Sequence, residues 1–302
     1  MGGPLNHPRP HAWLIVVLGL VAASVGCTRA PARDPLLSGW QDRAPAEGAD
    51  SIPELPSLSP LIDYGVVLVA EGDTLPVREQ AGSSGVEIAR LLPDQRPVRV
   101  TGRSSLLGSS VWVEIGLPGG GTGWAPAIHL TEARTSDEVC SDPRVADTLQ
   151  RFLRAGEAAD LGALGGAVSP WRGVAIRLDG RGGEVHIAPG ELATLLASAK
   201  PIDWQTRPEA GSDTTGSFAQ AILQPLAKAV QSVPAVCGVL PAGQTAIAPA
   251  WPTEYANLNY LAFYTPAEPA GSEFGWDTWA VGFDYAGGDP YVAVIIRYQG
   301  EI

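Results

Sequence analysis

The first 26 residues, together with Cys27 that follows them, constrain this chain most strongly, because they have the layout of an export leader that we expect to be removed from the mature protein. Residues 1–12 are polar with a cation at Arg9, residues 13–22 are apolar, and small residues lead into Cys27. An uncleaved anchor helix is the rival interpretation, but a membrane span needs roughly twenty apolar residues and this run is about half as long. We therefore expect a protein that folds outside the cytosol.

The run Ala23-Ser-Val-Gly-Cys27 resembles the lipobox of bacterial lipoproteins. In that family the cysteine thiol receives a diacylglyceryl group and the leader is cut in front of it. The resemblance implies a signal peptide at 1–26, a lipidated Cys27, and a lipid anchor that holds the protein on a bacterial membrane, facing the periplasm or the exterior. Two or three acyl chains anchor stably, because each buried methylene contributes about 0.8 kcal/mol.

Composition restricts the classes of partner and the number of domains that we expect. The chain has 20 Lys and Arg against 32 Asp and Glu, a net charge of −12. Binding to nucleic acid requires clustered cations against phosphate, so we expect no nucleic-acid partner. After Cys27, the segment up to residue 60 is dominated by Pro, Ala, Ser, Gly and charged residues, which predicts a flexible tether at 27–60. About 240 residues follow, enough for two modest domains.

Two cysteines, Cys140 and Cys237, remain once Cys27 is assigned to lipid. An even pair in an exported protein predicts a disulfide. Closing a loop of about a hundred residues would stabilise the fold by roughly 4 to 5 kcal/mol in the chain-entropy description. The alternative is a pair of buried free thiols.

Residues 61–133 consist of short apolar segments separated by turns, which is typical of an all-β unit. In residues 111–116 every second side chain is Val or Ile, so one face of that strand is aliphatic, whereas Trp112 and Glu114 occupy the other face. The expected strands are 64–70, 75–78, 86–92, 97–102, 111–117 and 122–125.

Three segments of this unit, Leu75-Pro-Val-Arg78, Trp112-Val-Glu-Ile115 and Gly123-Trp-Ala-Pro-Ala-Ile-His-Leu130, follow one another in the order typical of bacterial SH3 (SH3b) domains. The chain resembles this family over residues 61–133. The resemblance implies a small SH3-like β-barrel of the kind that attaches exported proteins to cell-wall peptides or to partner proteins. It places a binding groove around Arg78, Trp112 and Trp124.

Residues 136–302 have the pattern of an α+β domain with an antiparallel sheet. The expected helices are 143–156, 191–200 and 218–230, the last bent at Pro225. The expected strands are 174–178, 185–187, 258–264, 278–285 and 291–298, with a hairpin between the last two. Helices first and strands afterwards predict a sheet that is covered on one face by helices.

The last 60 residues are dense in aromatic side chains. Alternation predicts Trp279, Val281, Phe283 and Tyr285 on one face of a strand, and Tyr291, Ala293 and Ile295 on one face of the next. We expect these rings in the core, with any exposed remainder acting as a platform for a partner or a glycan. Stretches such as Glu184-Val-His-Ile-Ala-Pro189 and Glu254-Tyr-Ala-Asn-Leu-Asn-Tyr260 resemble a region of uncharacterised exported bacterial proteins, which implies no activity.

The sequence contains few arrangements of residues that could support catalysis. A cysteine peptidase needs a thiolate beside a histidine, but after Cys27 the chain has only His129 and His186, and both other cysteines are expected in a disulfide. These two histidines lack the spacing of a zinc site, and no phosphate loop is present, so we predict neither a metal nor a cofactor.

A pair of carboxylates for sugar cleavage is the enzyme hypothesis that stays open. Five acids lie near aromatic residues in the sequence: Glu184, Asp203, Glu254, Asp277 and Asp284. The sequence favours a membrane-anchored lipoprotein of the cell envelope that binds a wall peptide or a partner protein without catalysis. A glycan hydrolase and a purely structural envelope protein are the alternatives.

Overall fold

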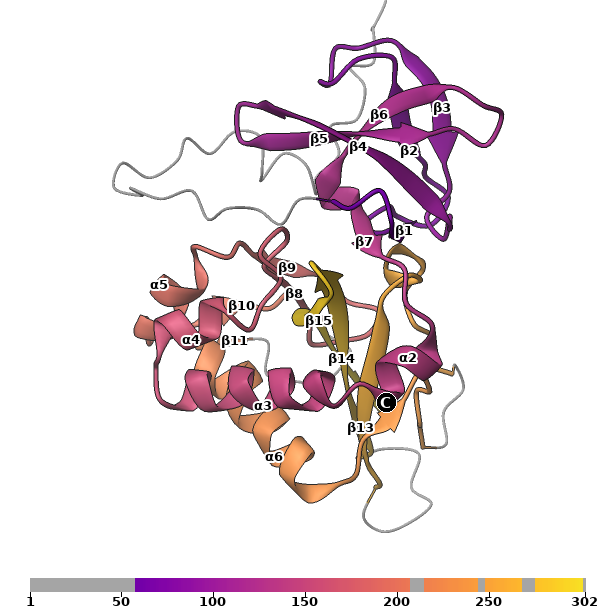
Figure 1. Cartoon of the computed structure of the whole chain (residues 1–302). Coiled ribbons are helices and arrows are strands. Elements are labelled where there is room, and N and C mark those ends of the chain that lie inside the picture. The colour runs from indigo at the N-terminus through magenta and orange to yellow at the C-terminus, as the bar shows by residue number, and fades with distance from the viewer. Residues whose placement is uncertain (1–57, 207–214, 244–247, 268–274, 301–302) are drawn as a thin grey trace, which may run out of the picture. The chain divides into compact units, whose positions relative to one another are not determined.

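The computed structural model describes residues 58–206, 215–243, 248–267 and 275–300 (Figure 1). These ranges are mostly β-structure, arranged in a curled seven-stranded sheet and a six-stranded sheet that carries helices. The predicted leader, Cys27 and almost all of the predicted tether lie outside the described residues. Within the described ranges no helix is long and apolar enough to cross a membrane.

The seven-stranded sheet contains all six strands expected between residues 61 and 133. Its strands are β1 (Asp63–Val66), β2 (Leu75–Arg78), β3 (Glu87–Leu91), β4 (Val98–Leu107), β5 (Ser110–Gly116), β6 (Thr122–Pro126) and β7 (Leu130–Glu132). The spatial order is β3-β2-β6-β5-β4-β1-β7, and every neighbouring pair is antiparallel. The sheet curls into a half-barrel (Figure 1).

Two strands of this sheet differ in length from the prediction. β4 continues to Leu107 because Gly102, with φ of 88°, lies in a bulge that bends the strand without ending it. β1 ends at Val66. Beyond it the chain bonds to a different part of the protein, since the Leu68 amide donates to the carbonyl of Glu254 at 2.8 Å.

The concave side of the half-barrel is its core. Val113 and Ile115 are buried there with Val77 and Ala125, as the alternation in β5 predicts. Trp112 and Glu114 therefore lie on the opposite, outer side of the sheet.

The six-stranded sheet is built from the C-terminal strands and two earlier ones. Its members are β8 (Val174–Arg177), β9 (Val185–Ile187), β12 (Val236–Cys237), β13 (Asn259–Thr265), β14 (Asp277–Ala286) and β15 (Asp289–Gln299). The order is β12-β13-β14-β15-β8-β9. β8 pairs with β15 in parallel, so the sheet is mixed and the expectation of a purely antiparallel sheet is wrong at this position. Parallel pairing needs a long connection, and the chain between β8 and β15 supplies one.

Helices cover one face of the six-stranded sheet (Figure 1), as predicted. They are α2 (Ser136–Ser141), α3 (Pro143–Glu157), α4 (Leu161–Gly165), α5 (Leu192–Ala197) and α6 (Gln224–Ser232); two short strands, β10 (Ile202–Asp203) and β11 (Thr215–Gly216), pair separately. Asp142 caps α3, since its carboxylate accepts from the amide of Arg144 at 3.0 Å. The helix expected at 218–230 is divided, because a π-helical turn, η3 (Ala219–Leu223), comes directly ahead of α6, whose first turn contains Pro225.

The aromatic strand β14 packs as the alternation predicts. Trp279, Phe283 and Tyr285 all belong to the core beneath the helices. The prediction for β15 is wrong, because a bulge shifts the register between Gly282 and Phe283. As a result Ile295 faces the helices whereas Ala293 lies in the cluster on the opposite face.

Candidate functional site

Arg78 and Trp124, two of the three residues predicted to line a groove, are cross-strand neighbours. Arg78 on β2 is in register with Trp124 on β6, and Trp124 is in register with Glu114 on β5. Their side chains therefore form a row on the outer side of the half-barrel. The half-buried ring of Trp124 is the centre of this row.

A second arginine, Arg103, contacts the ring of Trp124. The guanidinium carbon of Arg103, on β4, lies 5.6 Å from the centre of the Trp124 ring, within the range of a cation–π contact. Arg103 also donates to the Glu114 carboxylate at 2.7 Å, and the hydroxyls of Thr101 and Thr122 donate to the same carboxylate at 2.8 and 3.3 Å. Glu114 is thus satisfied and only 9% exposed, whereas the Arg103 side chain is 70% exposed.

Arg78 bonds to a neutral acceptor, whereas Arg103 bonds to a carboxylate. Nη1 of Arg78 donates to the carbonyl oxygen of Gly85 at 2.7 Å, which holds the loop after β2 against the sheet. Because that acceptor is neutral, this contact does not neutralise the guanidinium charge. The outer row therefore presents the Trp124 ring with Arg78 on one side and the Arg103–Glu114 ion pair on the other.

Trp112, the third predicted groove residue, lies on the same side of β5 as Glu114 and opposite Pro126. Its side chain is buried, with 7% of its surface exposed. It flanks the row and offers little free surface to a ligand.

A second polar cluster joins two of the five predicted acids. Nη2 of Arg177, at the end of β8, donates to Glu184 Oε2 at 2.9 Å and to Glu254 Oε1 at 2.8 Å. The hydroxyl of Tyr255 donates to the same Glu184 oxygen at 2.6 Å. Glu254 and Tyr255 belong to a short helix, η4 (Thr253–Tyr255), so the cluster ties this turn to β8 and to the residue ahead of β9.

Burial controls the electrostatics of this cluster. It raises the pKa of the Glu184 carboxyl, although the Tyr255 hydroxyl and the charge of Arg177 act in the opposite direction. It also raises the pKa of Tyr255 well above its usual value, and the neighbouring Glu184 charge adds to the shift. In β9, burial lowers the pKa of His186 to about 4, so this imidazole is neutral near pH 7.

The other three predicted acids lie apart from this cluster. Asp277 forms two hydrogen bonds with Arg297, at 2.9 and 3.0 Å, and Asp284 is buried against Arg172. Asp203 accepts from the backbone amide of Gln205. The five acids therefore do not converge on one site.

Sequence reasoning did not find Arg177 or Arg103, the two cations that organise these clusters. A signal exists for Arg177, because it ends the otherwise apolar strand Val174-Ala-Ile-Arg177. Arg103 has no comparable signal, since it follows the bulge at Gly102 that alternation does not reveal.

The predicted disulfide is present. Cys140 and Cys237 are joined, with a Cα–Cα distance of 5.7 Å, and link α2 to the edge strand β12. Neither sulfur is available as a thiolate nucleophile in this form. Among the described residues, no group of three or more His, Cys, Asp or Glu side chains is placed to hold a metal ion.

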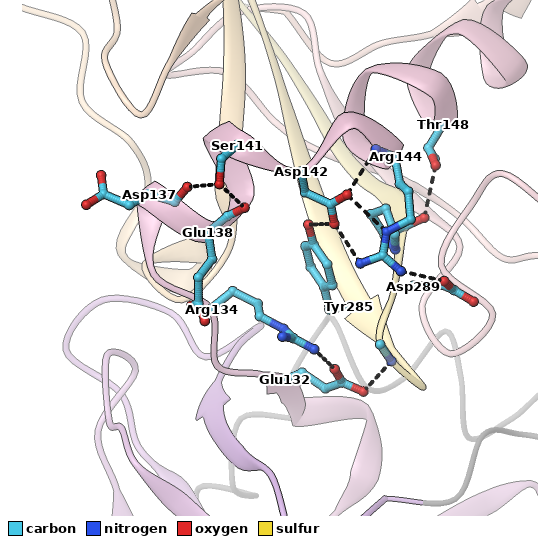
Figure 2. A network of polar contacts seen from close by, with 12 residues as sticks. Glu132, Arg134, Asp137, Glu138, Ser141, Asp142, Arg144, Thr148, Tyr285 and Asp289 are labelled. Atoms are coloured by element: carbon cyan, nitrogen blue, oxygen red, sulfur yellow. Dashed lines mark hydrogen bonds and ion pairs between the residues drawn. The ribbon is translucent and has the colours of Figure 1, made fainter.

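Figure 2 shows a polar network that holds the junction of α2 and α3 on the β14–β15 hairpin. The Tyr285 hydroxyl donates to Asp142 at 3.1 Å. Arg144 bridges Asp142 at 2.8 Å and Asp289 at 3.0 Å. Each of these groups has a partner within the fold, so the network is structural.

Comparisons with protein-family models, curated protein sequences and solved structures gave no match for this chain.

Proposed function

We propose that this chain is a lipoprotein of the bacterial envelope, anchored through Cys27, whose residues 61–133 form an SH3b-like binding module and whose residues 136–302 form a second domain of the α+β type. The leader supports export. The Cys140–Cys237 disulfide supports it independently, because disulfides persist in oxidising compartments and are rare in the cytosol.

The ligand of the module is a cell-wall peptide with free carboxylates. The observation that supports this choice is the position of Trp124 beside Arg78, whose guanidinium bonds to a neutral carbonyl, with the Arg103–Glu114 ion pair on the other side of the ring. Arginine and aromatic side chains are enriched at binding surfaces, and a guanidinium recognises carboxylates with paired hydrogen bonds. A peptide backbone packed on the Trp124 ring would place a carboxylate within reach of Arg78.

Retention of the full chain on an immobilised, sugar-free wall peptide tests this proposal. Trp124→Ala should weaken binding about tenfold or more, because a central tryptophan of an interface commonly contributes over 1.4 kcal/mol. Arg78→Gln should weaken it too. Tyr291→Ala is the matched control, since Tyr291 is a half-buried aromatic residue of β15 in the other sheet. No retention of the unaltered chain, or equal retention of the Trp124 variant, rejects peptide binding and favours a partner protein or a structural role.

The anchor has its own test. Cells that express the chain and are fed a radiolabelled fatty acid should label it and retain it in the membrane fraction, and Cys27→Ser should abolish both results. An unlabelled chain in the cell interior would contradict the envelope location.

A glycan hydrolase is the second candidate, and the meeting of Glu184 and Glu254 at Arg177 is the observation that favours it. Two carboxyl groups close together are the requirement for glycoside cleavage, and burial raises the pKa of Glu184 as a general acid requires. Release of new reducing ends from purified wall glycan, and loss of that release in Glu254→Gln, would support it. The absence of product removes this candidate and leaves peptide binding unaffected.

A further inference from the structure

The face of the six-stranded sheet opposite the helices carries several small residues beside larger ones such as Val294, Ile296 and Tyr298. Ala175, Ala280 and Ala293 are buried there, in one cluster with Tyr255 and the partly buried Trp251. Gly282 belongs to the same surface, because a Cβ built on it would lie 3.0 Å from the Trp251 ring. The absence of a side chain at Gly282 therefore makes room for the Trp251 ring.

Trp251 and Tyr260 form a stacked pair on this face of the sheet. Their ring centres are 4.2 Å apart with an angle of 25° between the planes. The indole N–H of Trp251 donates to the carbonyl of Tyr255 at 2.8 Å, which holds the ring in place. Both rings of the pair are only partly buried. They form an oriented aromatic surface next to solvent.

Hydrogen-bonding groups adjoin this pair. The ring of Tyr255 lies 6.1 Å from that of Trp251, and its hydroxyl donates to Glu184. Glu184 and Glu254 share Nη2 of Arg177, whose Nε is buried without a hydrogen-bond partner. All three of these charged side chains are partly exposed.

We propose that this surface, made by Trp251, Tyr260, Arg177, Glu184 and Glu254, is a binding site for a neutral sugar oligomer. A sugar ring has an apolar C–H face that packs on aromatic rings, and hydroxyls that donate to carboxylates and accept from a guanidinium. Two carboxylates against one guanidinium disfavour an anionic ligand, so a neutral polyhydroxyl compound suits the site better than an acidic peptide.

This second site goes beyond the peptide-binding surface around Trp124 and takes a different ligand. It requires no cleavage. A chain with both sites would hold the peptide and the sugar portions of one wall polymer through separate surfaces.

Isothermal titration of the full chain with chitotetraose, a peptide-free oligomer of N-acetylglucosamine, tests the inference. Tyr260→Ala should weaken binding about tenfold, since it removes one ring of the stacked pair. Glu254→Gln should also weaken binding, because one acceptor for sugar hydroxyls becomes an amide. Tyr291→Ala, the matched aromatic control, should bind as the unaltered chain does. Circular dichroism of each variant establishes that it is folded.

The outcomes separate this site from the peptide site. Trp124→Ala should leave chitotetraose binding unchanged while it reduces retention on the wall peptide, and Tyr260→Ala should do the reverse. Failure of the unaltered chain to bind chitotetraose, or equal affinity in a folded Tyr260→Ala variant, would overturn the sugar site without affecting the peptide proposal. Shortening of the oligomer during the titration would overturn the non-catalytic assignment.

Discussion

The guanidinium of Arg172 forms an ion pair with the carboxylate of Asp284 in the interior between the two sheets, where the side chains are 3% and 0% exposed. Asp284 also accepts from the hydroxyls of Ser169 and Thr131, each at 2.6 Å. Arg172 donates further to the carbonyl of Ile128 at 2.7 Å. Because Ile128 and Thr131 belong to the end of the seven-stranded unit, this pair couples the two sheets.

We predict that Asp284→Ala destabilises the whole described fold by about 3 to 5 kcal/mol, because it leaves the Arg172 charge buried without its partner. Urea unfolding measured by fluorescence gives the loss. Asp289→Ala is the control, since that exposed acid also pairs with an arginine, Arg144, but in solvent, where such pairs contribute little. Replacing both members, Arg172→Met with Asp284→Leu, should recover part of the stability. Equal stability of Asp284→Ala and the unaltered chain would contradict this role.

The disulfide should contribute to stability through the long loop that it closes. Cys140 and Cys237 are 97 residues apart, so the double change Cys140→Ala, Cys237→Ala should lower the free energy of unfolding by about 2 to 5 kcal/mol. Unfolding with and without reductant measures the same difference in the unaltered chain. Mass spectrometry after alkylation under non-reducing conditions should find no modified thiol at either position, and two alkylated thiols would contradict the prediction.

Local structure was largely predictable from the sequence. β2 and β9 begin and end at the predicted residues, because alternation and flanking turn residues define short strands well. The irregularities at Gly102 in β4 and at Ala293 in β15 were not predictable, since extra residues in a strand leave the composition of the pattern unchanged. The parallel pairing of β8 with β15 is likewise a long-range choice that no local pattern encodes.

The candidate sites were predictable only in part. Arg78 and Trp124 are brought together because the strands that carry them, β2 and β6, are paired. Glu184 and Glu254 are remote in the sequence and meet only because η4 packs beside β8, where Arg177 lies between them. The sequence identified both acids among five, but tertiary packing decided which two meet.

His186 makes stability depend on pH. Its pKa is about 4 in the folded protein, below the ordinary 6.5, because burial disfavours the charged form. Between pH 4 and pH 6.5 the His186 side chain is protonated in the unfolded chain but neutral in the folded protein. The free energy of unfolding is therefore unaffected by His186 above pH 6.5 and falls by roughly 3 kcal/mol as the pH is lowered toward 4. Glu184 acts in the opposite direction, since burial raises its pKa. His186→Gln should flatten the fall in unfolding free energy between pH 6.5 and 4, and an unchanged slope would exclude this origin.

Gly282 should be intolerant of any side chain. A Cβ at this position would collide with a methyl group of Val294 and lie 3.0 Å from the Trp251 ring. We therefore expect Gly282→Ala to destabilise the fold by about 1 to 3 kcal/mol, the usual cost of overpacking, and to displace Trp251 from Tyr260. Thermal unfolding measures the first effect, and the near-ultraviolet circular dichroism of the stacked rings measures the second. Gly119→Ala is the control, because nothing lies within 4 Å of a Cβ there. Equal melting temperatures for the two variants would show that the sheet yields to the added methyl group, and an unchanged near-ultraviolet spectrum would show that the Trp251 ring does not depend on this glycine.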